Sequence, residues 1–384
     1  MFTVLDVSRW QGSMQNDNAV ELGAAGTRSR TPADLSVTGR DKIGGNYRAG
    51  ANLVSYEIDF WGRVKSLNEA ALNQFLATDE ARQAFELGLV AQLANSYLLA
   101  QEFDERIVLA QKALATREES FRIMRRRAEV GSSSDLELRQ VESLLLNTRG
   151  ELAALERQRA QNDALLAQLT GHAPAPEAPP APLAEQGLEG PLPPGLPAEL
   201  LTRRPDLRAA EKRLAASQAS IRAARAAFLP NITLTGFGGA SSAELDGLFR
   251  GGASTWSFTP ALRLPLFDGG RNRANLSLAE ARRLVAVADY EASIQAAFRE
   301  VADALAARHW LAAQVHEQAA LVATESDRAR LAALRFERGV SSYLDVLDAQ
   351  RALFNAEQAL VQLRRAHMAS TVNLYKALGG GAPR

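Results

Sequence analysis

The sequence Arg127-Ala-Glu-Val-Gly-Ser-Ser-Ser-Asp-Leu-Glu137 returns later in the chain as Arg335-Phe-Glu-Arg-Gly-Val-Ser-Ser-Tyr-Leu-Asp345. The central glycines of the two stretches, Gly131 and Gly339, are separated by 208 residues (339 − 131). Helical segments often resemble one another through composition alone, but glycine, serines, leucine and an acid in one order are harder to obtain that way. The chain is therefore predicted to contain an internal duplication, which decides the architecture. Two more matches keep the offset: Gly62-Arg63 with Gly270-Arg271, and Gly171 with Gly379.

Each copy of the repeat is dominated by long helical stretches. From Gly62 to Val130 the chain has no proline and no glycine except Gly88, and residues of high helix propensity prevail. About 65 helical residues would extend roughly 100 Å at 1.5 Å per residue. The run breaks at Gly131, and Ser134 with Glu137 forms the capping-box pattern for a helix that returns to Thr170.

The second copy follows the same plan. A helix is predicted from Arg271 to Arg338, then a break at 339–342 and a return to Leu378, with Ser341 as the expected N-cap. Apolar positions recur every three or four residues among many alanines, which permits close helix packing. Two antiparallel helical hairpins are predicted, at residues 62–170 and 271–378.

A β-hairpin is predicted before each helical hairpin. From Trp256 to Phe267 the residues alternate with a period of two, and Leu229–Phe237 supplies the partner strand. The first copy offers Leu35–Gly39 and then Tyr47–Phe60, so the hairpins are placed at 31–60 and 229–267. The apolar face of the last strand is expected to contact lipid, and it consists of Trp256, Phe258, Leu262, Leu264 and Leu266.

The alternation admits two interpretations. Strands of about ten residues with one apolar and one polar face suit a tilted membrane barrel. A half-buried strand in a soluble sandwich gives the same pattern. The very long helices favour the first interpretation, because a compact soluble domain has no need of them.

Composition excludes several classes of function. Lysine plus arginine and aspartate plus glutamate number 44 each, so no basic footprint for nucleic acid is present. The absence of cysteine excludes disulfides and thiolate sites in this chain. His309 and His316 lie seven residues apart without a third metal ligand, and no nucleotide-binding or hydrolase motif occurs. We expect no enzyme activity, no cofactor and no metal site.

The sequence divides into four parts. Residues 1–27 form an atypical N-terminal segment, and residues 28–171 form the first repeat. Residues 172–205 form a strap, because ten of the fifteen prolines lie between Gly171 and Pro205. Residues 206–380 form the second repeat, which begins with a lead-in helix at 206–228.

Three motifs resemble those of one family. They are Leu200-Leu-Thr-Arg-Arg-Pro-Asp-Leu207, Leu264-Pro-Leu-Phe-Asp-Gly-Gly-Arg271 and Val340-Ser-Ser-Tyr-Leu-Asp-Val-Leu-Asp-Ala-Gln350. Together they resemble the TolC-like outer-membrane factor family, in its lipoprotein efflux-channel (NodT-like) branch. The resemblance implies a homotrimer in which four strands per subunit build a 12-stranded barrel in outer-membrane lipid. The helices would continue it as an α-helical tunnel into the bacterial periplasm.

The same resemblance implies a passive exit duct in a tripartite efflux pump, associated with antibiotic resistance. Its partners would be a periplasmic adaptor protein and an inner-membrane transporter, expected to be of the RND type. Two alternatives stay open: a duct for type I protein secretion, and a soluble helical scaffold. In the resembled family two features precede the first strand: a secretion signal, usually with a lipidated cysteine, and lead-in helices. Met1–Thr27 matches neither feature, from which we expect an N-terminally truncated chain.

The resemblance places a periplasmic gate at the helical tips. Asp345 and Asp348 match positions that form carboxylate rings in the family, and Glu137 is the first-copy equivalent of Asp345. The polar lock of the best-known member has no counterpart, because Phe336 and Ser341 occupy its two positions. Acids in the first turns of a helix also complement its dipole, which is the alternative reading. The tip residues expected to contact the adaptor are Gly131, Ser133, Ser134, Gly339, Ser341 and Ser342.

Overall fold

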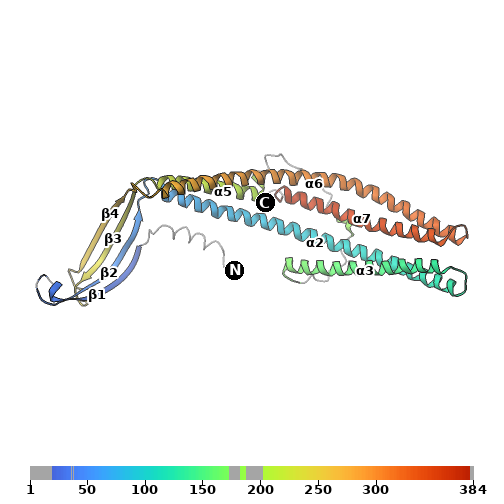
Figure 1. The fold of residues 1–384 in the computed structure, drawn as a ribbon, viewed down its shortest axis with the longest axis horizontal. Coiled ribbons are helices and arrows are strands. Elements are labelled where there is room, and N and C mark those ends of the chain that lie inside the picture. The colour runs from blue at the N-terminus through green and yellow to red at the C-terminus, as the bar shows by residue number, and fades with distance from the viewer. Residues whose placement is uncertain (1–19, 36, 38, 173–181, 187–201, 381–384) are drawn as a thin grey trace. The chain divides into compact units, whose positions relative to one another are not determined.

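The computed structural model describes residues 20–35, 37, 39–172, 182–186 and 202–380, which form two compact units (Figure 1). One unit comprises the chain up to Glu80 together with Arg208–Ala292. The other comprises Ala81–Leu207 and the chain from Ser293 onward. The second unit is mainly helical, and the first combines helices with one small antiparallel sheet, as predicted. Within these described ranges no helix is both long and apolar enough to cross a bilayer.

The sheet has four antiparallel strands in the order β1-β2-β3-β4. They are β1 (Val20–Thr31), β2 (Lys42–Glu57), β3 (Asn231–Ser242) and β4 (Ser254–Arg263). Strands from the two halves of the sequence meet where β2 pairs with β3. In the described part of the chain, β1 pairs only with β2 and β4 only with β3, so both outer edges of the sheet remain open.

The register gives the sheet one apolar face. Residues directly opposite in an antiparallel pair share a face, so Trp256 lies in one row with Gly238, Ala51 and Leu22. The next row on that face is Phe258, Gly236, Leu53 and Val20. Between these rows, on the opposite face, lie Ser257, Phe237, Asn52 and Glu21. All four strands therefore contribute to a single apolar surface.

Two strand predictions need correction. The described residues of the predicted strand Leu35–Gly39 are not extended: Leu35 belongs to the 3-10 turn Ala33–Leu35, and Gly39 has a φ of 66°. Asp41 fixes this turn by accepting from the backbone N–H of Ala33 at 2.9 Å. The first strand is β1, whose residues 20–27 fell in the segment considered atypical. Small residues lie on both faces of β1, so the two faces differ little in hydrophobicity and the sequence shows no clear alternation.

The last strand also ends earlier than predicted. β4 stops at Arg263, so Leu264 and Leu266 lie beyond it, in the link to the next helix. Pro265 has no backbone N–H to donate to a ladder, which accounts for the early end.

Long helices follow each β-hairpin. α2 (Arg63–Glu129) and α6 (Arg271–Glu337) have 67 residues each, and α3 (Asp135–Thr170) and α7 (Tyr343–Ala377) return from them. α5 (Pro205–Ala226) is the lead-in helix of the second copy. Asp59 caps α2 by accepting from the backbone N–H groups of Val64 and Lys65, and Asp268 accepts from that of Asn272 in α6.

In the helical unit the two copies share one core. Phe103 and Ala110 of α2 pack with Leu155 of α3 and Phe354 of α7. A second cluster joins Met124, Val141 and Leu347 from the same three helices near the tips. Polar contacts follow the same seam, because buried Glu102 accepts from Arg106 at 3.0 Å and from Arg365 of α7 at 2.8 Å. The first hairpin therefore cannot move freely along α7.

Most of the predicted strap lies outside the described residues, but both of its described pieces are anchored. Leu183, in the 3-10 turn η2 (Leu183–Glu185), is fully buried against Leu98, Val361 and Met368. Buried Arg204 donates to Asp206 at 2.7 Å, to Glu300 at 2.8 Å and to the backbone carbonyl of Ala377 at 3.0 Å. The Arg-Arg-Pro-Asp motif thus holds the C-terminal end of α7.

Candidate functional site

The turns of the two helical hairpins lie at the same end of the helical unit (Figure 1). In the first turn Ser132 N–H donates to Arg127 O at 2.8 Å and Gly131 N–H to Ala128 O at 3.0 Å. The equivalent bonds recur in the second turn, from Val340 to Arg335 and from Gly339 to Phe336, both at 2.9 Å. This pattern closes a helix with a left-handed residue, and Gly131 and Gly339 have φ values of 74° and 71°. The duplication therefore extends to individual hydrogen bonds.

The start of α3 is closed by a complete capping box. Ser134 Oγ accepts from Glu137 N–H at 3.2 Å, and the Glu137 carboxylate accepts from Ser134 N–H at 3.1 Å. Ser133 Oγ donates to the same carboxylate at 2.6 Å. The bond from Ser133, followed by that from the Ser134 backbone, lowers the pKa of Glu137. Glu137 and both serines are thus engaged in holding the turn.

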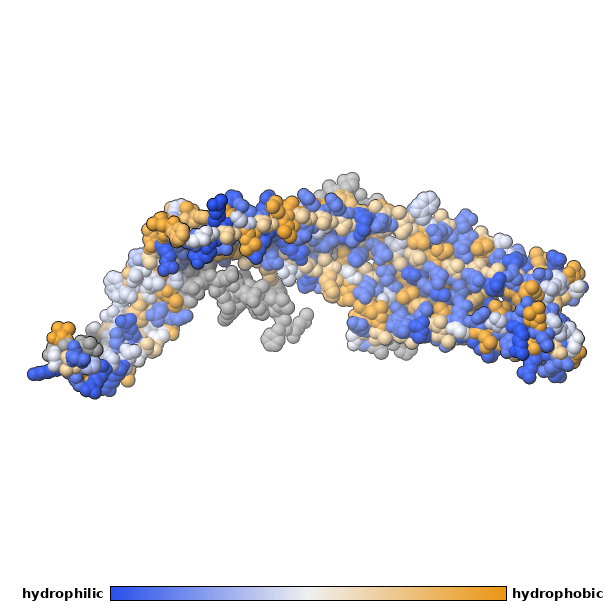
Figure 2. Space-filling view, viewed as in Figure 1, coloured by the Kyte–Doolittle hydropathy of each residue, from blue (hydrophilic) through white to orange (hydrophobic). Residues whose placement is uncertain are grey.

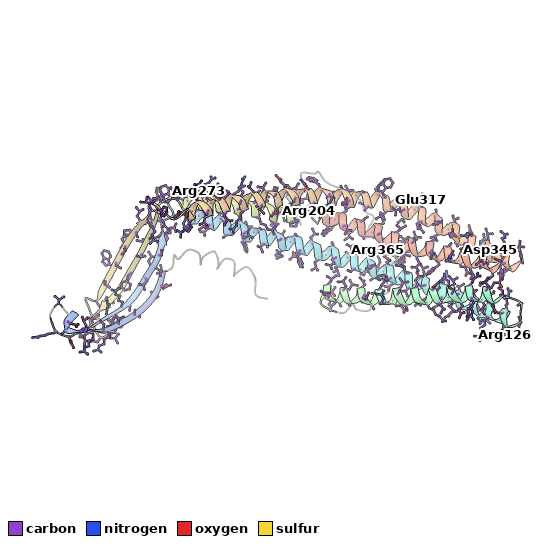
Figure 3. All side chains as sticks on the ribbon, viewed as in Figure 1. Arg126, Arg204, Arg273, Glu317, Asp345 and Arg365 are labelled. Carbon is purple, nitrogen blue, oxygen red and sulfur yellow. The ribbon has the colours of Figure 1, made fainter. Side chains whose placement is uncertain are left out.

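The start of α7 is built differently, and the predicted cap is wrong. The N-cap is Ser342, whose side chain makes no capping hydrogen bond. Ser341 Oγ is buried and has no hydrogen-bond partner in the described structure. The residue equivalent to Glu137 is Asp345, which is one methylene shorter and does not reach back to the cap. Its carboxylate is exposed and forms no ion pair with any described residue (Figure 3).

Asp348 has two arginine partners that the sequence analysis did not anticipate. Arg328 of α6 donates to its carboxylate at 2.6 Å, and Arg351 of α7 donates at 2.7 Å. Arg328 also pairs with Glu325 at 3.1 Å. The two predicted gate acids therefore differ: Asp348 is neutralised within its own chain, whereas Asp345 is not. Spacing of three residues could have suggested Arg351, but Arg328 lies on another helix and left no local signal.

An aromatic pair lies within the second tip, and an arginine of the first tip contacts it, where the sequence lacks a polar lock. The rings of Phe336 and Tyr343 lie 4.9 Å apart, and the guanidinium of Arg127 lies 5.3 Å from the Phe336 ring centre. Further from the tip, buried Arg117 donates to Thr148 and lies 5.0 Å from the ring centre of Phe354. Burial lowers the pKa of Arg117. In both places an arginine of α2 lies over a phenylalanine of the second copy.

Two exposed leucines mark equivalent places on the tips. Leu136 and Leu344 are 208 residues apart (344 − 136) and each lies in the first turn of a returning helix. They are 68% and 52% exposed, whereas their neighbours Val141 and Leu347 are buried. The serines predicted to contact the adaptor are less available, since Ser133 and Ser134 bind Glu137 and Ser341 Oγ is buried.

On the sheet, the predicted lipid-facing residues are accessible. Trp256, Phe258 and Leu262 of β4 lie on the apolar face and are 80%, 63% and 70% exposed. Val20 and Leu22 of β1, which the sequence analysis missed, extend this face to the other edge and are equally exposed. An apolar surface of this extent on a soluble protein would need a partner to cover it.

Comparison with known proteins decides the family. The family model described as "Outer membrane efflux protein" matches residues 19–172 and 196–380. The chain belongs to the outer membrane efflux protein family. It is 44% identical over 385 residues to the outer membrane protein OprJ of Pseudomonas aeruginosa. The alignment covers 99% of the chain and 80% of OprJ. It is 43% identical over 359 residues to the solvent efflux pump outer membrane protein SrpC of Pseudomonas putida, covering 93% of the chain and 76% of SrpC.

The solved structures give the same result for this efflux protein. The open state of the MtrE outer membrane channel of Neisseria gonorrhoeae matches it with a TM-score of 0.86 and 37% identity. The match covers 98% of the chain and 84% of MtrE. Similarity at this level covers both the sheet and the helical hairpins, so the fold is that of an outer-membrane channel subunit.

Proposed function

We propose that the protein is the outer-membrane channel of a tripartite efflux pump and acts as a passive exit duct for small molecules. It resides in the bacterial outer membrane and extends into the periplasm. The single observation that carries this function is the open sheet, with one continuous apolar face and two unpaired edges, joined to helices of 67 residues. In a sheet exposed to lipid, every backbone N–H and C=O group must be paired within the protein, because lipid tails offer no hydrogen-bond partners. Three copies joined edge to edge would close a 12-stranded barrel.

The substrate class is inferred from the relatives. OprJ and SrpC are outer membrane proteins, and SrpC belongs to a solvent efflux pump. Another relative, 42% identical, is a toluene efflux pump outer membrane protein of Pseudomonas putida. We infer that the chain exports apolar small molecules such as aromatic solvents and antibiotics. An adaptor and an inner-membrane transporter of the RND type would load the duct.

The tips are the proposed contact with the adaptor and the proposed gate. Leu136 and Leu344 offer exposed apolar contacts at repeat-equivalent positions, so an adaptor could bind both hairpins in the same way. The unpaired Asp345 carboxylates of three subunits would surround the tunnel axis, and the contact of Arg127 with the Phe336 ring would hold the two tips together. Asp348 contributes less negative electrostatic potential at the tunnel mouth, because Arg328 and Arg351 offset its charge.

The test is complementation in a Gram-negative strain that lacks its own efflux channel but retains a matching transporter and adaptor. We expect the protein to restore growth in toluene and to raise the inhibitory concentration of antibiotics. Purified protein should run as a detergent-extracted trimer and conduct ions in planar bilayers. A monomer that stays soluble without detergent would contradict the proposal. Export of a polypeptide instead of small molecules would indicate the type I secretion alternative.

A further inference from the structure

A collar of exposed apolar side chains lies where the sheet meets the helices. It consists of six residues whose side chains are all at least two-fifths exposed: Ile58, Phe60, Phe228, Leu264, Leu266 and Phe267. Leu266 and Phe267 are 90% and 92% exposed. Figure 2 shows hydrophobic residues gathered at this joint. Nothing in the described part of the chain covers them.

The collar continues the apolar face of the sheet. Along the chain, Ile58 and Phe60 follow Tyr56 after β2 ends at Glu57, and Leu264 and Leu266 follow Leu262 after β4 ends at Arg263. The ten residues of β4 already match the roughly 9–11 that a tilted strand needs to cross the hydrocarbon layer. The collar follows those residues, so it lies at the level of the lipid headgroups and the first acyl carbons.

Cations lie next to the collar in a place that helix stability disfavours. The first turns of α2 and α6 contain no acid and carry Arg63, Lys65, Arg271 and Arg273. Cations there oppose the helix dipole. The returning helices α3 and α7 follow the usual preference, with Asp135, Glu137 and Asp345 in their first turns. The basic residues on α2 and α6 therefore have another cause.

Two of these four cations are compensated within the chain. Arg63 forms two hydrogen bonds with Glu57, and Asp268 lies close enough to Arg271 to interact with it. Lys65 and Arg273 are exposed and have no ion-pair partner among the described residues. Figure 3 shows Arg273 at the start of α6. They are equivalent in the duplication, 208 residues apart (273 − 65). Asp59 and Asp268 already accept from backbone N–H groups at these helix starts. An anion from outside the chain would therefore bind the side chains of Lys65 and Arg273.

We propose that the collar together with Lys65 and Arg273 binds phospholipids of the inner leaflet of the outer membrane. The acyl chains contact the collar, and the anionic headgroup contacts the two cations. The inference rests on the proposed function for its orientation, since the helices leave the sheet on the periplasmic side. Because both copies carry the same arrangement, each subunit offers two such positions, and a trimer would present a ring of them.

The test is a titration of the delipidated trimer in detergent with fluorescent phosphatidylglycerol and, separately, phosphatidylcholine. We expect phosphatidylglycerol to bind more tightly. Lys65→Gln and Arg273→Gln should each weaken its binding about fivefold, which corresponds to roughly 1 kcal/mol per cation at an anionic surface. Binding of phosphatidylcholine should change little. Equal affinity for the two lipids in the wild type would overturn the inference.

Arg282→Gln is the matched control. Arg282 is an exposed cation on the same helix without a described ion pair, and nine residues (282 − 273) place it about 14 Å further along α6. We expect it to leave lipid binding unchanged. If Arg282→Gln weakens phosphatidylglycerol binding as much as Arg273→Gln does, binding depends on the total charge of the protein. The proposed headgroup site at Lys65 and Arg273 is then wrong.

A second variant tests the collar itself. Leu266→Ser with Phe267→Ser should weaken binding of both lipids and leave the trimer intact, since lipid and not protein covers these side chains. Dissociation of the trimer would show that a second copy covers the collar, and it would overturn the inference. The proposed function is tested separately, because wild-type protein that conducts as a trimer without any lipid preference would refute only this inference.

Discussion

At the scale of single residues, the two acids of the proposed gate have different electrostatic surroundings. Asp345 is exposed and unpaired in the described structure, whereas Asp348 lies between Arg328 and Arg351. Two carboxylates about 8 Å apart repel by roughly 0.5 kcal/mol in bulk water and about 2 kcal/mol at an effective dielectric of 20. A ring of Asp345 would therefore attract cations to the tunnel mouth.

Replacing Asp345 should change ion selectivity more than trimer stability. We expect Asp345→Asn to lower cation selectivity and to weaken block by multivalent cations, as measured by reversal potentials and single-channel currents. Asp348→Asn should also shift selectivity toward anions, because it leaves Arg351 without its acid and Arg328 paired with Glu325 alone. Glu137→Gln is the control with the smaller effect, since that carboxylate serves the capping box. Unchanged selectivity in Asp345→Asn would place this residue outside the tunnel mouth.

The aromatic contact at the tip should act as an apolar lock. Removing the Phe336 ring forfeits one aromatic pair and one cation–π contact, together about 1–2 kcal/mol. If these contacts exist only in the closed tip, Phe336→Ala should raise the open probability roughly five- to thirtyfold. Phe336→Tyr keeps the ring and should behave like the wild type. Equal open probabilities in single-channel recordings of all three proteins would exclude this role.

At the scale of elements, the two copies agree more closely where α2 and α6 end than where α3 and α7 begin. The glycine closures of α2 and α6 share the same hydrogen bonds. The starts of α3 and α7 differ, because Glu137 completes a capping box and Asp345 is too short to do so. The second turn therefore has the less stable helix start, in the hairpin that carries the proposed gate.

A matched pair of substitutions measures this difference. Ser134→Ala should destabilise the first turn of α3 by about 1 kcal/mol, because it removes an N-cap hydrogen bond. Ser342→Ala should have a much smaller effect on α7, since the Ser342 side chain makes no such bond. Amide hydrogen exchange of the two first turns gives both values. Equal loss of protection would mean that Ser342 also caps its helix in solution.

The capping box should also make the first tip sensitive to acid. The pKa of Glu137 is lowered in the folded state, so its stabilisation is fully present above the unfolded value of about 4.3. That stabilisation is lost as the pH falls through the lower folded value. Protection factors in the first turn of α3 should therefore decline below about pH 4. Glu137→Gln should remove the dependence; a wild-type profile that stays flat to pH 2 would contradict it.

At the scale of the whole molecule, the sheet register decides which residues lie on the apolar face that we propose contacts lipid. Phe258 and Ser257 are neighbours on β4, but they lie in rows on opposite faces of the sheet. Arginine on the lipid face of a barrel costs about 2–4 kcal/mol near the bilayer midplane and much less elsewhere. Neighbouring positions therefore give an internal control.

The barrel prediction follows from that contrast. Phe258→Arg should reduce folding into lipid vesicles by about 2–4 kcal/mol in denaturant titrations, and the yield of trimer should fall with it. Ser257→Arg should cost much less, because its side chain faces water. Equal tolerance of the two substitutions would be incompatible with a lipid-facing β4.

The sequence by itself determined the features that depend on local chemistry. Helical hairpins separated by glycine turns, the capping box at Ser134 and the apolar alternation at Trp256 to Leu262 all follow from propensity and spacing within a few residues. The internal duplication is likewise a property of the sequence alone. These features sufficed to predict the fold class, and the resemblance of three motifs to a known family implied the outer-membrane channel.

Only the tertiary structure decided the remainder, because it depends on residues distant in the chain. β1 is recognisable as a strand by its pairing with β2, since its own small residues give little hydrophobic contrast. Arg328 reaches Asp348 from another helix, and Arg127 reaches Phe336 from the other copy. The N-cap of α7 is Ser342 and not the predicted Ser341, whose hydroxyl is buried. Strand pairing and side-chain partners between helices are set by register and packing, which local spacing does not encode.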